Sequence, residues 1–281
     1  MKVRLLLTAL VLGLASLACN ININVPASQT GETQTLTINE AAPGGSPARV
    51  EIAMGGGELN INGGGQNLVT GQIDYNLAEW QPEITRTGDT VRIAQEAKTI
   101  PIPGNEQMVN RWEIQLGNTP MELDVQAGAY DGTLNLSGVP LVNLEVNGGA
   151  SNSEVRFDSP NPQVMESFSY ETGASNVELI GIGHASPSVF TFRCGAGDYL
   201  IDFSGQPQRA ITANITGALG NLDVVVPAGT SVVVNLTGDL QDVNLEGGWT
   251  QENDRYLAAG SEPGITINLE MSLGQLDLII K

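Results

Sequence analysis

The chain offers few side chains that could act as a nucleophile or a general base. It contains one histidine, His184, and two cysteines, Cys19 and Cys194. His184 lies in the segment GIGHASPS, and no G-x-S-x-G nucleophile elbow is present elsewhere in the sequence. A histidine-based metal site needs more than one histidine. We therefore interpret His184 as a solvated loop residue and expect neither a metal site nor a cofactor.

Cys194 follows two aromatic residues at alternate positions. The spacing of Phe190, Phe192 and Cys194 is that of a strand with one buried face. A redox-active thiol would need a second thiol or several neighbouring cations, and only Arg193 is adjacent. We predict that Cys194 is a small inward-facing core residue.

Paired carboxylates are the remaining chemistry that the sequence could support. Asp198 with Asp202, and Glu252 with Asp254, are the pairs that could resemble a glycosidase site. Acids along the outside of strands are also the ordinary solvated face of a sheet. We favour that interpretation and predict that the protein is not an enzyme, with a polysaccharide-degrading β-helix enzyme as the alternative.

Aromatic side chains in loops are candidates for contact with a partner. Trp249 lies in the loop GGWTQENDRY together with Tyr256, and we expect these two side chains to be exposed contacts. Trp80 and Trp112 lie in segments of alternating apolar residues, so we predict that both belong to the core.

The first residues predict where the protein is found. MKVRLLLTALVLGLASLAC begins with Lys2 and Arg4 and continues with an apolar run that is too short to span a membrane. Its end resembles the lipobox of bacterial lipoproteins, which implies cleavage after residue 18 and diacylglycerol on the thiol of Cys19. Residues 1–18 are then a lipoprotein signal peptide and 19–31 a polar tether. The alternative is an ordinary secretory signal with an incidental Cys19.

The charge of the chain excludes one large class of partners. Lys and Arg total 12 against 31 Asp and Glu, which gives a net charge of −19. A chain this acidic is repelled by nucleic acid and by anionic lipid surfaces, so we expect no nucleic-acid partner.

A turn of small residues recurs about every 22 residues through the second half of the chain. Apolar residues alternate before and after each turn, as in short strands. The turns are Gly128-Ala129, Gly149-Ala150, Gly173-Ala174, Gly195-Ala196, Gly217-Ala218 and Gly238-Asp239. This repeat predicts a β-solenoid of stacked coils, with glycine at a corner where adjacent backbones approach closely.

Two alternative repeats and two modification motifs fit the sequence less well. The leucine-rich repeat consensus is absent, and GAGDYLIDF, which faintly resembles a calcium-binding nonapeptide, does not recur in tandem. The sequons that begin at Asn214 and Asn235 fall within predicted strands, so we interpret them as polar strand positions.

The segments outside the repeat add a meander and a hairpin. Residues 49–66 repeat the phrase of strand, glycine corner and strand, and residues 67–96 alternate as an antiparallel meander. Residues 247–264 interrupt the spacing as a long surface loop or hairpin, and ITINLEMSLGQLDLIIK forms a last strand, turn and strand.

An ordered set of phrases in the first half resembles a known family. GGGELNI, LVTGQIDYN, EWQPEI, RWEIQL, PMELDVQAGA, DGTLNLSGVPL and LEVNGGA are similar to the bacterial toast-rack domain. That family is related to the C-terminal domain of LiaF-type cell-envelope stress proteins and to adhesin domains. The resemblance is close over residues 48–158 and looser beyond. It implies stacked β-strands outside the cytoplasmic membrane, and it brings no catalytic residues.

These observations predict an all-β protein. The fold is a solenoid, or rack, of stacked short strands with an N-terminal antiparallel meander. A toast-rack-like domain at 32–158 continues into further coils at 159–281, as one structural unit. The expected function is a non-enzymatic binding or scaffold protein, adhesin-like or related to envelope stress. It would be anchored by lipid on Cys19 to the bacterial membrane, facing outside the cytoplasm, with envelope proteins or glycans as partners.

Overall fold

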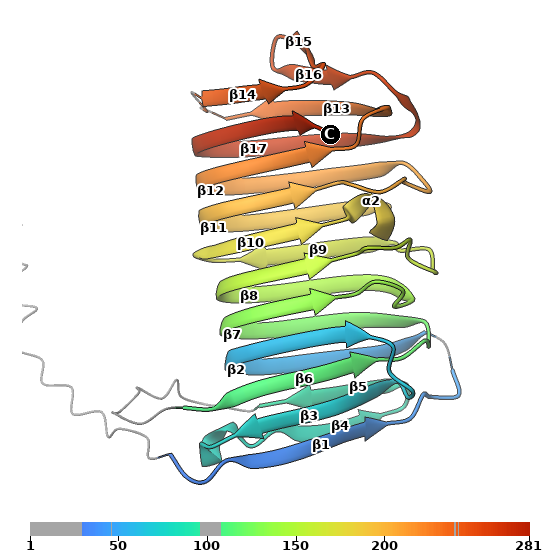
Figure 1. The fold of residues 1–281 in the computed structure, drawn as a ribbon, viewed down its shortest axis with the longest axis vertical. Helices are drawn as coiled ribbons and strands as arrows, with labels where there is room; N and C mark the ends of the chain where they lie inside the picture. The colour runs from blue at the N-terminus through green and yellow to red at the C-terminus, as the bar shows by residue number, and fades with distance from the viewer. Residues whose placement is uncertain (1–29, 46, 96–107, 239, 241) are drawn as a thin grey trace, which may run out of the picture.

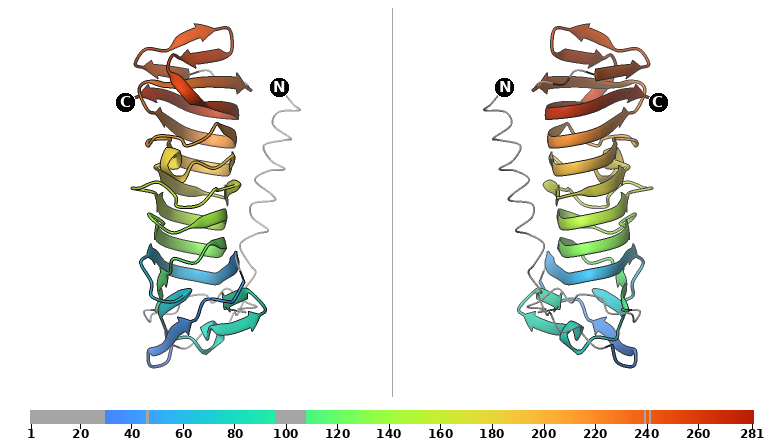
Figure 2. Two further views of the ribbon diagram at one scale, coloured as in Figure 1. Left: turned by 90° about the vertical axis from the view of Figure 1, so that its right-hand side faces the viewer. Right: turned by 90° about the vertical axis from the view of Figure 1, so that its left-hand side faces the viewer.

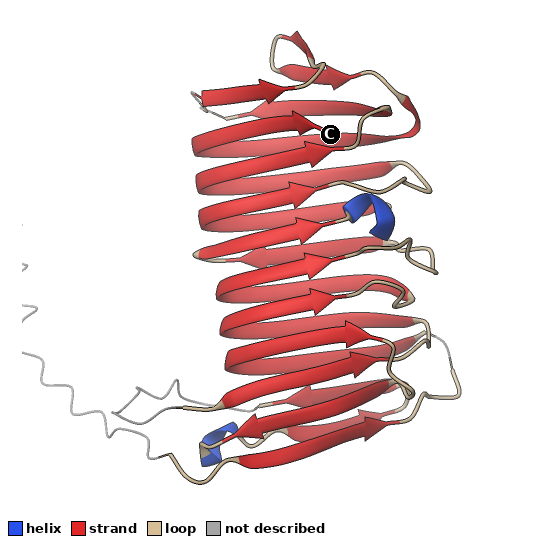
Figure 3. Cartoon of the chain, viewed as in Figure 1, coloured by secondary structure: helices blue, strands red, loops and turns tan. Residues whose placement is uncertain are grey.

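The computed structural model describes residues 30–45, 47–95, 108–238, 240 and 242–281. The predicted signal peptide, Cys19 and residues 19–29 of the predicted tether lie outside these ranges. Almost every element is a strand, and the helices η2 (Ala78–Trp80) and α2 (Ile182–Ala185) are each about one turn long (Figure 3). The all-β prediction is confirmed.

The body of the molecule is a stack of parallel coils in register (Figure 1). Most coils are one long strand that bends near its middle, and in one coil the bend separates β9 from β10. In stacking order the coils are β2 (Ala48–Gly63), β7 (Met121–Asn135), β8 (Leu141–Arg156), β9 (Ser167–Thr172) with β10 (Ser175–Ile180), β11 (Val189–Asp202), β12 (Ile211–Val226) and β17 (Ser261–Ile280). The parallel ladder crosses residue 158 without interruption.

Glycines form the bends because neighbouring coils leave no room for a side chain there. A Cβ on Gly149 would lie 2.7 Å from the carbonyl oxygen of Gly128, and one on Gly173 would lie 2.5 Å from that of Gly149. The amide nitrogen of Gly195 also donates to the carbonyl oxygen of Gly173 at 3.1 Å. The predicted small-residue corners at Gly149, Gly173 and Gly195 are therefore confirmed, and the bends lie along one edge of the stack (Figure 1). In β12 the close backbone approach is at Gly220 and not at the predicted Gly217, and Asp239 of the last predicted corner lies outside the described residues.

The N-terminal end of the stack is formed by β1 and by the chain between β2 and β7. There β5 (Thr90–Ala94) and β6 (Asn110–Leu116) pair in parallel with the two halves of β2, as a further coil. The antiparallel strands β4 (Glu83–Thr87), β3 (Val69–Tyr75) and β1 (Gln34–Glu40) complete this end. The predicted meander over residues 67–96 is only partly present: β4 and β5 form an antiparallel hairpin, but β3 pairs with β1 and β6 on the other side of the bend and not with β4. Trp112 is fully buried and Trp80 is 7% exposed, so both are core residues as expected.

The C-terminal end is built in a similar way, which corrects the expected chain order. Sequential stacking would place β13 (Thr230–Thr237) and β14 (Asp242–Glu246) directly on β12. Instead β17 lies between them, with Ile211 beside Ile265 on one side and Val232 beside the same Ile265 on the other. The hairpin of β15 (Thr250–Glu252) and β16 (Arg255–Ala258) lies beyond β13, at the opposite end of the stack from β1 (Figure 2).

The bends divide the stack into two walls. The first wall contains β4, β5, the N-terminal halves of the coils, β13, β16 and β15. The second wall contains β1, β3, β6, the C-terminal halves of the coils and β14. Because successive side chains of a strand point to opposite faces, each wall has an inner face toward the core and an outer face toward solvent.

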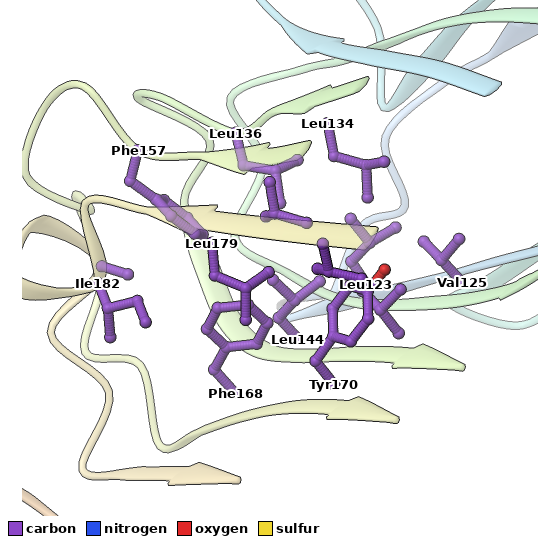
Figure 4. Close-up of a cluster of buried hydrophobic side chains, with 14 of the residues drawn as sticks. Leu123, Val125, Leu134, Leu136, Leu144, Phe157, Phe168, Tyr170, Leu179 and Ile182 are labelled. Atoms are coloured by element: carbon purple, nitrogen blue, oxygen red, sulfur yellow. The ribbon is translucent and has the colours of Figure 1, made fainter. Parts of the chain in front are cut away.

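Apolar side chains of both walls meet in the core (Figure 4). Phe190 of the first wall packs edge-on against Phe168 of the next coil, with ring centroids 5.2 Å apart, and against Phe203 at 5.8 Å. Phe192 packs across the core against Tyr199 of the second wall at 5.4 Å. Period-2 alternation therefore identified the buried face correctly.

Candidate functional site

His184 and Cys194 lie on opposite edges of the stack. His184 belongs to α2 on the rim away from the bend, whereas Cys194 directly precedes the bend glycine Gly195. His184 is half-buried, which corrects the prediction of a solvated loop residue. The reason is that α2 packs on the neighbouring turn, where the backbone N–H of Asn161 donates to the carbonyl oxygen of His184 at 2.9 Å. The two residues cannot form a catalytic dyad.

Cys194 is directed toward the core but is half-buried rather than fully buried. It packs beside the bend of the next coil, where a Cβ on Gly217 would lie 3.3 Å from its sulfur. Burial raises the pKa of the Cys194 thiol to about 11. The residue is therefore a protonated thiol at neutral pH and a poor nucleophile.

The carboxylate pairs named from the sequence do not form a site. Asp198 and Asp202 lie four residues apart on β11, about 13 Å along an extended strand, beyond the reach of a glycosidase pair. Glu252 and Asp254 are exposed at the turn of the β15–β16 hairpin, at the end of the stack.

The expected aromatic contact is wrong for Tyr256. Its side chain is 5% exposed, because β16 pairs with β13 in the register that places Tyr256 opposite the buried Val234. Trp249 is half-buried, and its Nε1 donates to the carbonyl oxygen of Leu278 at 3.0 Å. Both aromatic side chains cover the C-terminal end of the core.

An open groove of about 870 Å³ follows the outer face of the second wall. It crosses the seven strands β2, β7, β8, β10, β11, β12 and β17. Their spacing of about 4.8 Å makes it about 29 Å long. Its floor is lined by Glu58, Asn60, Asp131, Gly132, Thr133, Asn152, Ser153, Glu154, Asn176, Val177, Glu178, Asp198, Tyr199, Leu200, Asn221, Asp223 and Gln275.

Carboxylates dominate the electrostatics of this groove. Six of its lining residues are Asp or Glu, and none of the residues that line it is Lys or Arg. Burial raises the pKa of Asp223, and the neighbouring carboxylates of Asp277 and Asp198 raise it further. Asn221 donates to Asp198 at 2.7 Å, so part of the negative charge is held by amide hydrogen bonds between coils.

The sequence contains a signal for the groove that the prediction missed. Asp131, Asn152, Asn176 and Asp198 each stand three residues after a bend glycine. Register then places them side by side in one outward column across four coils. Recurrence of Asp or Asn at a fixed offset from the repeat glycine would have predicted this column.

The comparisons with known proteins identify the family. Residues 25–180 match the family described as the N-terminal domain of toast_rack, DUF2154, and the chain belongs to this family. The match ends at the last residue of β10, so β11 to β17 extend the same stack beyond it. Among curated proteins, none matches the chain.

Two solved structures are similar in shape. A candidate cell adhesion protein from Clostridium sporogenes ATCC 15579 is 21% identical with a TM-score of 0.50, and the alignment covers 89% of this chain and 99% of that one. A candidate adhesin from Bacteroides fragilis NCTC 9343 is 11% identical with a TM-score of 0.37, over 89% and 96% of the two chains. The first of these shares the fold. Within the described ranges, no helix has the length and apolar character needed to cross a membrane.

Proposed function

We propose that the protein is a non-enzymatic, adhesin-like binding protein of the cell envelope. The observation that carries this proposal is the open groove along the second wall. A groove about 29 Å long on a regular ladder of strands suits an extended partner, such as an envelope protein or glycan, better than a small substrate. Its carboxylates favour a partner with basic or hydroxyl groups over an anionic one.

The distribution of reactive groups supports a binding role. His184 and Cys194 are on opposite edges of the stack, and the Cys194 thiol is protonated at neutral pH. Within the part of the chain that the structure describes, no group of three or more His, Cys, Asp and Glu residues is placed to hold a metal ion. The arrangement therefore offers many hydrogen-bonding contacts and few of the parts of a catalytic site.

The proposal includes a lipid anchor on Cys19. A lipobox-like segment precedes Cys19, and the described chain enters the stack at the β1 end. A short tether would thus hold the whole stack at the outer side of the membrane. The family resemblance also allows a role in envelope stress, in which the groove would hold the molecule that is sensed.

The anchor is tested by membrane partition in a bacterial host. We expect the wild-type protein to enter the detergent phase and Cys19→Ala to leave it. Cys194→Ala is the matched control and should partition like the wild type. A wild-type protein that is released entirely in soluble form would contradict the anchor.

The groove is tested by capture from envelope extract at low and high salt. We expect the combined change Asp131→Asn, Asp198→Asn and Asp223→Asn to abolish capture of any component that the wild type holds in a salt-sensitive way. Asp242→Asn, Glu246→Gln and Glu252→Gln remove the same charge at the C-terminal end and should leave capture intact. Equal loss in both sets would mean that net charge, and not the groove, governs binding.

One observation favours the alternative of a polysaccharide-degrading enzyme. Asp223 and Asp277 are register neighbours beside the groove, and the pKa of Asp223 is raised by burial and then by Asp277. A carboxylic acid beside a second carboxylate is the pattern of a glycosidase. Turnover of an envelope polysaccharide that disappears in Asp223→Asn and in Asp277→Asn would replace the binding proposal with this one.

A further inference from the structure

Two neighbouring columns on the outer face of the first wall lack charge over its C-terminal coils. One outward column runs through Ser169, Thr191, Asn214, Asn268 and Asn235. The next column away from the bend, from Ser167 to Val233, holds only serine, threonine and valine. We call these two columns on β9, β11, β12, β17 and β13 the neutral face. The ion pair of Arg193 with Glu171, together with Glu270, borders it toward the bend. The first column ends at charged residues on both sides, with Glu145 of β8 beside Ser169 and Arg255 of β16 beside Asn235.

The neutral face is unusual for this chain. The net charge is −19, and the second wall of the same coils is strongly acidic. The N-terminal part of the first wall is charged as well: the Arg49 guanidinium contacts Glu51 at 2.7 Å, Glu122 at 3.0 Å and Asp124 at 3.2 Å. Core packing does not determine outward residues, so the fold does not require this local absence of charge. An uncharged partner is the kind that such a face suits.

The asparagines of the neutral face form a hydrogen-bonded ladder. Asn235 Nδ2 donates to Asn268 Oδ1 at 3.0 Å, and Asn268 Nδ2 donates to Asn214 Oδ1 at 3.1 Å. Asn268 uses one N–H in this ladder, so its second N–H is available to a ligand. The ladder also accounts for the asparagines of the two sequons, because Asn214 and Asn235 lie in the same outward column on either side of Asn268.

The size of the neutral face argues against a second copy of the chain as its partner. Five strands about 4.8 Å apart, each used over two outward positions or about 13 Å, give roughly 300 Å² on each partner. The roughly 600 Å² buried in such a dimer is below the range of about 1,200–2,000 Å² for stable protein interfaces. A polysaccharide does not face this limit, because each extended chain offers the same hydroxyl groups again and again along its length.

We propose that the neutral face binds an uncharged, hydroxyl-rich polysaccharide. Its chains lie across the strands, where the amides and hydroxyls of successive coils meet successive sugars. Val189, which is 41% exposed, and Val233 supply apolar contact with the faces of the sugar rings. This is a second binding face, separate from the groove of the proposed function.

The test is sedimentation of the full chain, purified in detergent, with insoluble chitin and with cellulose. We expect the wild type to sediment with at least one of them. Asn214→Asp places a charge on the neutral face and should weaken binding about tenfold. Asn221→Asp makes the same change on the same strand, but in the groove, and should bind like the wild type. Thr212→Asp, with circular dichroism as a check of folding, should repeat the effect of Asn214→Asp.

Three results would overturn the proposal. Wild-type protein that sediments with neither polysaccharide has no such ligand, whatever the groove captures. An equal loss in Asn221→Asp would move the binding to the groove and support only the proposed function. A dimer that forms without polysaccharide and is lost in Asn214→Asp would make a second copy the occupant.

Discussion

The two walls of coils β11, β12 and β17 are built alike inside and differ outside. Their inner positions are apolar on both sides of the bend, as with Ile215 and Leu222 on β12. Their outer positions diverge: Asn214 belongs to an uncharged ladder, whereas Asp223 belongs to an acidic groove. Inward residues therefore specify the solenoid, while outward residues are free to specify partners. The outward residues of one wall can therefore be changed without affecting the other wall, whereas a change in the shared core affects both.

The strongest way to break both walls together is to truncate the core that they share. Phe190→Ala removes a ring that packs against Phe168 and Phe203. We expect a loss of about 3–5 kcal/mol in the free energy of unfolding, measured by denaturant titration. The outward neighbour Thr191→Ala should change it by less than about 0.5 kcal/mol. Equal effects of the two changes would show that the inward register is wrong.

A smaller loss is expected at the bend where the walls meet. Gly220 has φ of 143°, and a Cβ there would collide with the carbonyl oxygen of Gly197. We expect Gly220→Ala to reduce the free energy of unfolding by about 1–3 kcal/mol. Gly248→Ala is the matched control, because nothing lies within 4 Å of its Cβ position. A stable Gly220→Ala variant would mean that the coils are not in this close register.

The smallest effect on stability concerns the acidic wall alone. Burial and Asp277 raise the pKa of Asp223 in the folded state, so the native protein holds this proton more tightly than the unfolded chain does. This carboxyl therefore favours folding more as the pH falls from neutral through its raised pKa. We expect Asp223→Asn to be slightly more stable than the wild type at pH 7. On acidification the variant should gain less stability than the wild type does, because it lacks this carboxyl. Denaturant titrations at pH 7 and pH 5 compare the two.

If Asp223→Asn were less stable than the wild type at pH 7, the folded protein would stabilise the ionised carboxylate of Asp223, which contradicts its raised pKa. Asp124 on the first wall is the matched comparison, because burial and then Glu145 raise its pKa too. Asp124→Asn also loses the contact with Arg49, and should gain less stability at pH 7 than Asp223→Asn.

The sequence predicts the repeating parts of the fold well and the ends poorly. The glycines at the bends are predictable because backbones approach closely there, and the burial of Trp112 and Phe192 is predictable from the alternation of apolar residues. The place of β17 in the stack is not predictable. Val232 and Val234 of β13 alternate just as Ile265 and Ile267 of β17 do, so either strand could pair with β12. The burial of a residue in a hairpin depends on its cross-strand partner, which the pattern does not specify. This is why Tyr256 was expected at the surface.

The candidate sites were predictable only in part. Single reactive residues such as His184 were easy to dismiss, because no partner of suitable chemistry lies near them in the sequence. The groove and the neutral face both consist of ordinary polar residues that become neighbours through register between coils. Such columns appear only when residues at equal offsets from each bend are compared.

The most direct test of the division between the walls is methyl NMR of the full chain, titrated with a soluble, uncharged chitin oligosaccharide. Val189 and Val233 report on the neutral face, and Leu200 reports on the groove. We expect the resonances of Val189 and Val233 to shift while those of Leu200 stay in place. A shift of Leu200 with both valines unchanged, or no shift in any of the three, would contradict it.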